Sequence, residues 1–233
     1  MVSYVNIHTH CGGCGVNILD VGELYAGLKI ELKKRRSGGE RFFYSVGWHP
    51  MKKLTRKREE ILKELGQMIA LKEVVAVGEC GLDRRSAVLF SEQIPLLIGQ
   101  VELAERARKP LIIHCVKAYP DLIRVRKGMK TTVPWIIHGF NNNEQILNQL
   151  LEHGFYISVG PQLLNPRSNA FRLLRKIPLY ALFLESDDRD VRIEAIYESA
   201  ASELGIGEEE LKRVIWDNYQ KVIEIRYDDG MVK

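Results

Sequence analysis

The sequence predicts an α/β fold whose parallel strands close into a TIM-type (β/α) barrel. Short apolar runs alternate with helical patterns from about Tyr44 onward, as expected of a parallel sheet with covering helices. Six of these runs lead directly into a histidine or a carboxylate. Because every strand of such a barrel points its carboxyl end at one face, these polar residues should meet in one pocket. At 233 residues the chain fits a single domain, residues 1–233.

Composition and charge narrow the function classes. With 45% hydrophobic and 27% charged residues, the chain resembles an ordinary soluble globular protein. No segment approaches the roughly 18 consecutive apolar residues of a membrane span, so no membrane contact is expected. Met1–Tyr4 lacks the features of a signal peptide, which predicts a cytoplasmic location. The net charge of +4 tolerates a polyanionic substrate without requiring one.

The strands and helices follow from hydrophobic periodicity and from local start and stop signals. The run Asn141 to Asn143 can cap a helix, Gly205 ends a helix, and Pro110 precedes a strand. The expected strands are Val5–Ile7, Tyr44–Trp48, Val74–Gly78, Leu111–Ile113, Trp135–Ile137 and Ala181–Leu184. The expected helices are Arg58–Ala70, Ala87–Arg108, Asn143–Glu152, Val191–Leu204 and Glu208–Ile225.

The sequence does not determine the secondary structure of the segment from Cys11 to Glu40. Val16–Leu19 and Leu28–Leu32 are compatible with two short strands or with one poor helix. The barrel is therefore open to being slightly reduced or distorted near the amino terminus. Ser37–Gly39 reads as a turn, and Tyr227–Lys233 is expected to be a mobile terminus.

The strongest chemical signal is a set of potential metal ligands at the strand ends. His8 and His10 are two residues apart, so on a strand both imidazoles point the same way and can reach one ion. With them stand further histidines and carboxylates of the types that hold borderline divalent metals. Two ions are then plausible, and a carboxylate such as Glu79 can bridge them. The six potential ligands are His8, His10, Glu79, His114, His138 and Asp187.

The cysteines are a weaker candidate for metal binding. Three of the four directly follow a proposed ligand, yet no second Cys or His pair stands at zinc-finger spacing. In a cytosolic chain we expect reduced, partly buried thiols. They are Cys11, Cys14, Cys80 and Cys115.

Through most of its length the chain resembles the TatD-like metal-dependent deoxyribonucleases, of the amidohydrolase-type barrels, and in particular a compact subgroup. The resemblance rests on a series of short motifs in a fixed order. They are Asn6–His10, Val46–Pro50, Val77–Asp83, Gln93, Pro110–Cys115, Ile136–Phe140, Ile157–Gly160, Leu184–Asp188 and Asn218.

The resemblance implies a dinuclear site and a hydrolytic mechanism. His8, His10, Glu79 and Asp187 would hold one divalent ion, Mg, Mn or Zn, and Glu79, His114 and His138 would hold a second. A metal-activated water would cleave the phosphodiester bonds of DNA, and Asp187 would take its proton. Both Glu79 and Asp187 are thus candidate catalytic residues.

The resemblance also implies substrate contacts, with one departure. His49 would face a phosphate, and Trp48 is a candidate for stacking a base, although core packing is the stronger expectation for a Trp. Lys117 stands where many family members have Arg, and it cannot reproduce the planar bidentate grip of Arg on a phosphate.

Some further expectations and alternatives stay open at this point. Asp83 and Glu185 are candidates for positioning a neighbouring residue, and His153 is expected at a helix end away from any metal. A small phosphoester or nucleotide is an alternative substrate, and a metal-binding barrel that has lost its activity is the alternative outside enzymes. No lysine stands at the strand end where related deaminases join their ions. A monomer is favoured.

Overall fold

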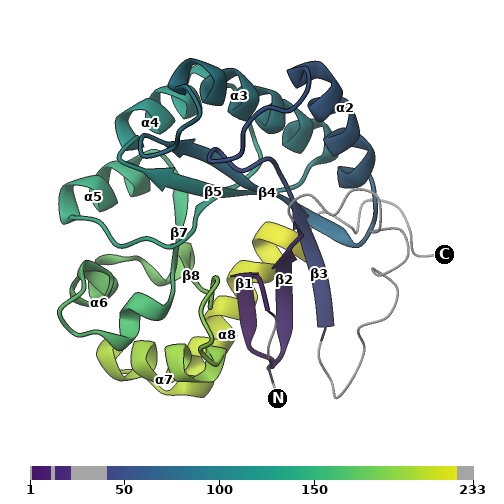
Figure 1. Cartoon of the computed structure of the whole chain (residues 1–233). Helices are drawn as coiled ribbons and strands as arrows, with labels where there is room; N and C mark the ends of the chain where they lie inside the picture. Colours follow the sequence, from purple (N-terminus) through teal and green to yellow (C-terminus); the bar gives the residue numbers. More distant parts are fainter. Residues whose placement is uncertain (1, 12–13, 22–40, 225–233) are drawn as a thin grey trace.

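Eight parallel strands in sequence order form the wall of a barrel, as predicted (Figure 1). The computed structural model describes residues 2–11, 14–21 and 41–224. Each strand pairs in parallel with the next one along the chain. The strands are β1 (Val5–Thr9), β2 (Val16–Asp20), β3 (Arg41–Val46), β4 (Val74–Asp83), β5 (Leu111–Val116), β6 (Trp135–Ile137), β7 (Phe155–Val159) and β8 (Leu182–Leu184).

Helices follow the strands from β3 onward and form the outer layer of the barrel (Figure 1). Among the described helices, none combines the length and apolar character that a membrane crossing needs. The α-helices are α2 (Arg58–Ile69), α3 (Phe90–Ala107), α4 (Tyr119–Gly128), α5 (Glu144–Glu152), α6 (Asn169–Leu173), α7 (Ile193–Leu204) and α8 (Glu208–Tyr219).

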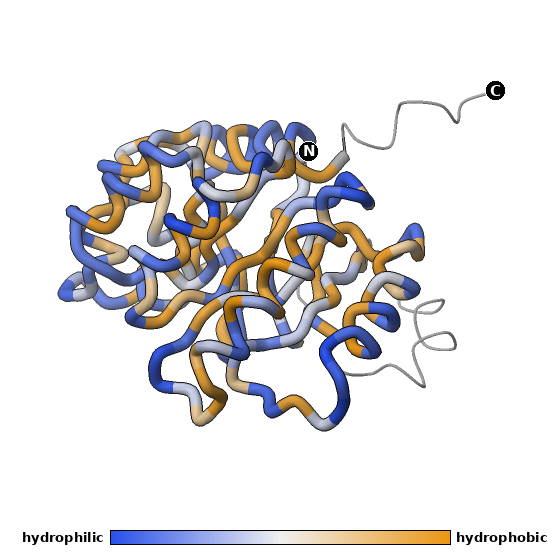
Figure 2. The backbone as a smooth tube through the Cα atoms, turned by 90° about the horizontal axis from the view of Figure 1, so that it is seen from above, coloured by the Kyte–Doolittle hydropathy of each residue, from blue (hydrophilic) through white to orange (hydrophobic). Residues whose placement is uncertain are grey.

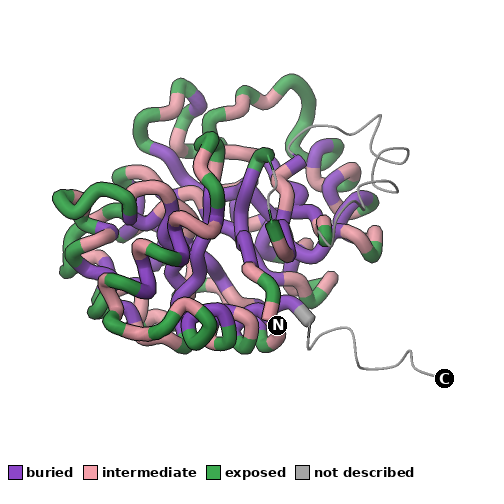
Figure 3. The backbone as a smooth tube through the Cα atoms, turned by 90° about the horizontal axis from the view of Figure 1, so that it is seen from below, coloured by how far each residue is buried: buried purple, intermediate pink, exposed green. Residues whose placement is uncertain are grey.

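The apolar core is continuous from the strands to the inner faces of the helices. All five residues of β1 and all ten of β4 are buried, because strands of a parallel barrel are covered on both faces. Apolar segments follow the interior strands while hydrophilic ones lie on the outer turns (Figure 2). The same division appears in burial, with exposed residues at the periphery (Figure 3).

The amino-terminal part of the barrel is reduced. Val16–Asp20 is a strand, which resolves one of the two alternatives that the sequence left open. Only residues 10–15 connect β1 to the parallel β2, and the described residues among them contain no helix. A parallel connection ordinarily takes a dozen or more residues, so this short link makes the barrel compact. The predicted features at Leu28–Leu32, Ser37–Gly39 and Tyr227–Lys233 lie outside the described residues.

The barrel closes at the carboxyl ends of its first and last strands. β1 and β8 are joined beyond β8 by a parallel bridge between Thr9 and Asp187. The amide of Asp187 donates to the His8 carbonyl at 3.2 Å, and the amide of His10 donates to the Asp187 carbonyl at 3.1 Å. Below this bridge, the Asn6 side chain donates to Ser186 Oγ at 2.8 Å and accepts the Ser186 amide at 3.0 Å.

Most helix predictions are confirmed, with differences at their ends. Asn143 caps α5 through a hydrogen bond from the Ile146 amide, and Gly205 ends α7 at a φ of 72°. The start of α3 was placed too early, since Leu89 is still extended and the helix begins at Phe90. The helix α4 was not predicted. Its only buried residues are Tyr119, Leu122 and Ile123, which is too short a pattern of apolar residues to indicate a helix. The five-residue α6, Asn169–Leu173, was not predicted either.

Asn218→Ala is expected to lower the free energy of unfolding by about 1–3 kcal/mol. The buried Asn218 amide donates to the carbonyls of Leu179 and Leu182 at 2.7 and 2.9 Å, so its loss leaves both acceptors without this donor and loosens β8 from α8. Urea unfolding would measure the change. The exposed Asn148→Ala on α5 is the matched control, and equal stability of the two variants would contradict this role.

Candidate metal centre

The strand ends bring six predicted ligands into one cluster, and Glu79 lies at its centre. Its Oε1 lies 2.8 Å from His138 Nε2 and 2.9 Å from His114 Nδ1. Its Oε2 faces the other side, 3.5 Å from His8 Nε2 and 4.0 Å from His10 Nε2. His49 Nε2 also lies 3.0 Å from Oε1, so the two carboxylate oxygens face different sets of histidines.

Asp187 completes the group on the β1 side. Its Oδ1 lies 3.5 Å from His8 Nε2 and 3.8 Å from His10 Nε2. The residue has a φ of 54°, a left-handed conformation that Asp adopts more readily than most residues. The backbone bridge to β1 holds it in place. The same backbone bridge therefore closes the barrel and holds Asp187 beside His8 and His10.

Two of the clustered histidines are held from behind by carboxylates. His114 Nε2 lies 3.0 Å from Asp83 Oδ2, and His138 Nδ1 lies 3.4 Å from Glu185 Oε1 without the geometry of a hydrogen bond. Glu185 is itself fixed by the Gly139 amide at 2.6 Å and by the Ser158 hydroxyl. A carboxylate behind a histidine keeps the ring proton on that side, so the inward nitrogen presents its lone pair.

His49 belongs to the same cluster but has the opposite arrangement. Its Nδ1 accepts the Met51 amide at 3.1 Å, so in the neutral ring the proton must be on Nε2. That Nε2 lies 3.0 Å from Glu79 Oε1 and donates to it. A protonated nitrogen cannot bind a metal. His49 is therefore built as a hydrogen-bond donor, which agrees with its expected part in phosphate binding.

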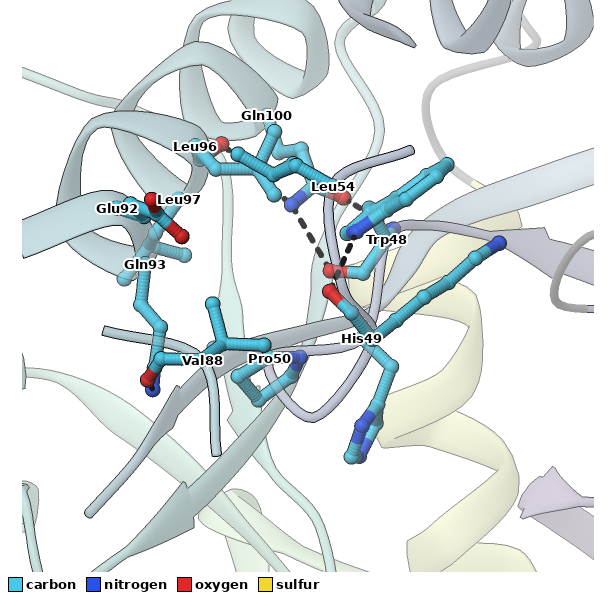
Figure 4. Close-up of a pocket in the computed structure, with 12 residues that line it drawn as sticks. Trp48, His49, Pro50, Leu54, Val88, Glu92, Gln93, Leu96, Leu97 and Gln100 are labelled. Atoms are coloured by element: carbon cyan, nitrogen blue, oxygen red, sulfur yellow. Dashed lines mark hydrogen bonds between the residues drawn. The ribbon is translucent and has the colours of Figure 1, made fainter. Parts of the chain in front are cut away.

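Trp48 is placed differently from its neighbour His49. Its side chain is 2% exposed, its ring carries Lys52 Nζ at 3.7 Å, and its amide donates to Gln100 Oε1 at 2.6 Å. The imidazole of His49 points away from Trp48 and Gln100 (Figure 4). Both residues line a small pocket against α3. A buried ring has no open face for a base, so the structure favours the packing alternative for Trp48 over stacking.

Within the cluster, the carboxylates raise the pKa values of imidazoles, and the imidazoles lower the pKa values of carboxylates. Burial acts to raise the pKa of Glu79, but His138, His114 and His49 outweigh it and hold this pKa well below its usual range. Burial and His138 act to lower the pKa of His8, but the carboxylates of Asp187 and Glu79 raise it to about 9. Burial likewise opposes the rise in the pKa of His138, which Glu79 and Glu185 drive well above its usual value.

The donor set fits divalent metal ions. His8 is fully buried, yet neither of its ring nitrogens forms a hydrogen bond within the described part of the chain. A buried polar atom without a partner is costly, and a metal ion supplies the missing partner. Nitrogen and carboxylate donors of this kind suit Zn, Mn and similar ions. Groups of three donors with atoms within 4.8 Å of one another include His8, His10 and Asp187, and His8, Glu79 and His138.

The remaining candidates lie at the edge of the cluster or outside it. Lys117 is exposed directly after β5, with a φ of 53°. His153 caps the carboxyl end of α5, as expected. None of the cysteines belongs to a group of possible ligands among the described residues; Cys80 and Cys115 are buried, while Cys11 and Cys14 are exposed.

Sequence reasoning missed Asp20, which ends β2. Its Oδ1 accepts the Glu79 amide at 3.1 Å, and its Oδ2 lies 4.0 Å from His10 Nδ1. The signal was the one used for the other strands, an apolar run that leads into a carboxylate. It was overlooked because Val16–Leu19 had not been assigned to a strand.

Comparison with known proteins agrees with this geometry. The family model described as TatD related DNase matches residues 9–224. The chain belongs to the TatD related DNase family. The matched residues include five of the six clustered side chains, and His8 lies directly before them.

Two curated relatives and one solved structure illustrate the likeness. The chain is 31% identical over 153 residues to the uncharacterized metal-dependent hydrolase YjjV of Escherichia coli K12, which covers 64% of this chain and 59% of that protein. It is 29% identical over 152 residues to the uncharacterized metal-dependent hydrolase YabD of Bacillus subtilis, which covers 63% and 58%. The chain thus spans less than two thirds of either relative. The crystal structure of the E. coli YjjV protein has the same fold, with a TM-score of 0.81 at 21% identity over 95% of this chain and 98% of that one.

In metal-stripped protein, the free energy of unfolding is expected to fall as the pH rises from about 6.5 to about 9. His8 has a folded pKa above its ordinary value of 6.5, so its stabilising charge is fully present below 6.5 and is lost as the pH passes through about 9. Urea unfolding in the presence of a chelator would measure this. His8→Asn should reduce the dependence but not abolish it, because the pKa of His138 is also raised, whereas the control His153→Asn should keep it in full. An unchanged slope in the His8 variant would show that His8 does not contribute.

Proposed function

We propose that this chain is a divalent-metal-dependent hydrolase that cleaves phosphodiester bonds of DNA. The observation that carries the proposal is the division of the Glu79 oxygens between two sets of histidines, at 2.8–3.0 Å around Oε1 and 3.5–4.0 Å around Oε2. A carboxylate in this position suits the bridge between two ions. The description of the family points to DNA, and the names of the two curated relatives point to metal-dependent hydrolysis.

In this proposal two divalent ions are held by two sets of residues that share Glu79. When bound, such ions act as Lewis acids on a phosphoryl oxygen and lower the pKa of water toward neutrality. Zn, Mn and Mg are the candidates. By their distances to Glu79 and Asp187, the first set is His8, His10, Asp187 and Glu79, and the second is His114, His138 and Glu79.

Asp187 is the proposed proton acceptor. Burial acts to raise its pKa, but His8 and His138 lower it, so its carboxylate is unprotonated near neutral pH. Its side chain is 23% exposed, whereas Glu79 is 8% exposed, so Asp187 is the more accessible of the two from the catalytic face. Oδ1 is thereby placed to take a proton from the attacking nucleophile and to orient it.

His49 and Lys117 are the proposed phosphate contacts. The proton of His49 is on Nε2 because Nδ1 accepts the Met51 amide; this N–H donates to Glu79 Oε1 and would have to turn from it to a phosphate when substrate binds. Lys117 adds a positive charge on the neighbouring strand end. Its ammonium is a point charge, so it attracts a phosphate without imposing the orientation that a bidentate Arg would give.

A small phosphoester or nucleotide is the second candidate substrate, and the short β1–β2 link favours it. Loops at the carboxyl ends of barrel strands form the walls of the site. The link here is only residues 10–15, which leaves less wall to hold a long polymer. Comparing kcat/KM on a single-stranded oligonucleotide and on a simple aryl phosphate would separate the two substrates.

Glu79→Gln is expected to reduce metal-dependent release of nucleotides from single-stranded DNA by more than about 100-fold. Removal of a partner behind a ligand typically costs 10–100-fold, and Glu79 contacts four imidazoles directly. The assay would use metal-stripped protein with Mg, Mn or Zn restored in turn. Glu198→Gln, an exposed position on α7, is the matched control. Full activity in the Glu79 variant would refute the bridging role, and no release by the wild type with any metal would refute the nuclease.

His49→Ala is expected to lower kcat/KM roughly 10- to 150-fold, since a hydrogen bond to a charged group contributes about 1.5–3 kcal/mol. Both ions should still bind, because the ring presents a proton and no lone pair to the cluster, although their affinity can fall with the loss of the hydrogen bond to Glu79. Steady-state kinetics and calorimetric titration with Mn or Zn would measure both quantities. Loss of one ion in this variant would show instead that His49 is a ligand.

A further inference from the structure

The carboxylate of Asp20 lies behind the metal cluster and contacts two of its members. Oδ1 accepts the Glu79 amide at 3.1 Å and also faces the Ser45 hydroxyl at 3.5 Å. Oδ2 faces His10 Nδ1 at 4.0 Å. The Asp20 side chain is 10% exposed, so a buried acid joins β2 to residues on β4 and just after β1.

Asp20 lies on the outer side of the His10 ring, as two other carboxylates do for their histidines, although its distance of 4.0 Å is longer than theirs. Asp83 lies behind His114 at 3.0 Å, and Glu185 lies behind His138 at 3.4 Å. In both cases the opposite ring nitrogen faces Glu79 at 2.8–2.9 Å. The two nitrogens of an imidazole point away from each other, so a carboxylate on one side fixes the lone pair on the other.

His10 fits this pattern. Its Nε2 faces Asp187 at 3.8 Å and Glu79 at 4.0 Å, while its Nδ1 faces Asp20. The His10 side chain is 37% exposed, and the 4.0 Å between its Nδ1 and Asp20 Oδ2 is longer than a hydrogen bond, so the carboxylate acts on the ring through its charge. With the proton on Nδ1, the Nε2 lone pair is directed into the cluster.

We propose that Asp20 is a positioning residue of the metal centre, which sets the tautomer of His10 and anchors the backbone of Glu79. The expected effect of Asp20 on ion binding rests on the proposed function. Its effect on the His10 tautomer and on the Glu79 backbone does not depend on catalysis. His10, Asp20 and Glu79 also have donor atoms within 4.8 Å of one another, so direct coordination by Asp20 is the competing role that the second experiment tests.

The first experiment reads the tautomer of His10 in the metal-free protein. Long-range proton–nitrogen correlation spectra of the histidine rings, recorded near pH 8 where ordinary imidazoles are neutral, identify which nitrogen carries the proton. The wild type should show the His10 proton on Nδ1. A proton on Nε2 would overturn the proposal without any variant.

The second experiment uses Asp20→Asn. The amide oxygen of Asn can still accept the Glu79 N–H, but its NH₂ group then faces His10 Nδ1 as a donor. The His10 proton should therefore move to Nε2, and calorimetric titration with Mn or Zn should show about a 10- to 100-fold weaker affinity at one of two sites. Unchanged tautomer and affinity would refute the proposal. Loss of an ion with the tautomer unchanged would refute it in favour of direct coordination.

Ser45→Ala is the matched control, because it removes the other side-chain contact of the same carboxylate. It should leave both the tautomer and the affinities unchanged, and a loss equal to that of Asp20→Asn would reduce Asp20 to a packing role. If the wild type binds no metal, the proposed function fails, whereas the tautomer measurement still decides the role of Asp20.

Discussion

The buried carboxylate of Glu79 is the interaction on which the site depends. It stands among five imidazoles, four of them within 3.5 Å of one of its oxygens, and it is the nearest acid to His114 and His138 on their inward side. Such a group can stay ionised inside a protein only if positive charge surrounds it. His8 on β1 and His138 directly after β6, whose pKa values are raised, supply that charge, so the arrangement of the strands keeps Glu79 ionised.

The same constraint explains how a reduced barrel keeps its site. The site does not depend on the link between β1 and β2, because its members stand on or just after the strands themselves. Closure between β1 and β8 uses the backbones of His8, His10 and Asp187. Shortening a peripheral connection therefore leaves the distances among these residues intact, while loss of the closing bridge would separate Asp187 from both histidines.

A site residue could be predicted from the sequence where it follows a recognisable apolar run. Barrel strands are nearly continuous apolar runs, so Glu79 and His114 could be located from the sequence. Asp20 could not, because the polar Asn17 interrupts a short run that reads equally well as a helix. His49 was set apart from the ligands only by the family resemblance. Its tautomer could not be predicted, because the contact with the Met51 amide depends on the geometry of the turn.

The tautomers and the charges of the cluster together describe a site in which protons and metal ions compete. Without ions, the carboxylates raise the pKa of His8 and His138, so protons on these imidazoles balance Glu79 and Asp187. A ligand histidine must give up its inward proton to bind a metal. Outer carboxylates such as Asp83 and Glu185 assist by retaining the proton on the far nitrogen. His49 differs from these histidines, because the Met51 amide and not a carboxylate contacts its outer nitrogen, so its proton faces the cluster. Within one group of histidines, His49 is therefore a hydrogen-bond donor and the others are the proposed ligands.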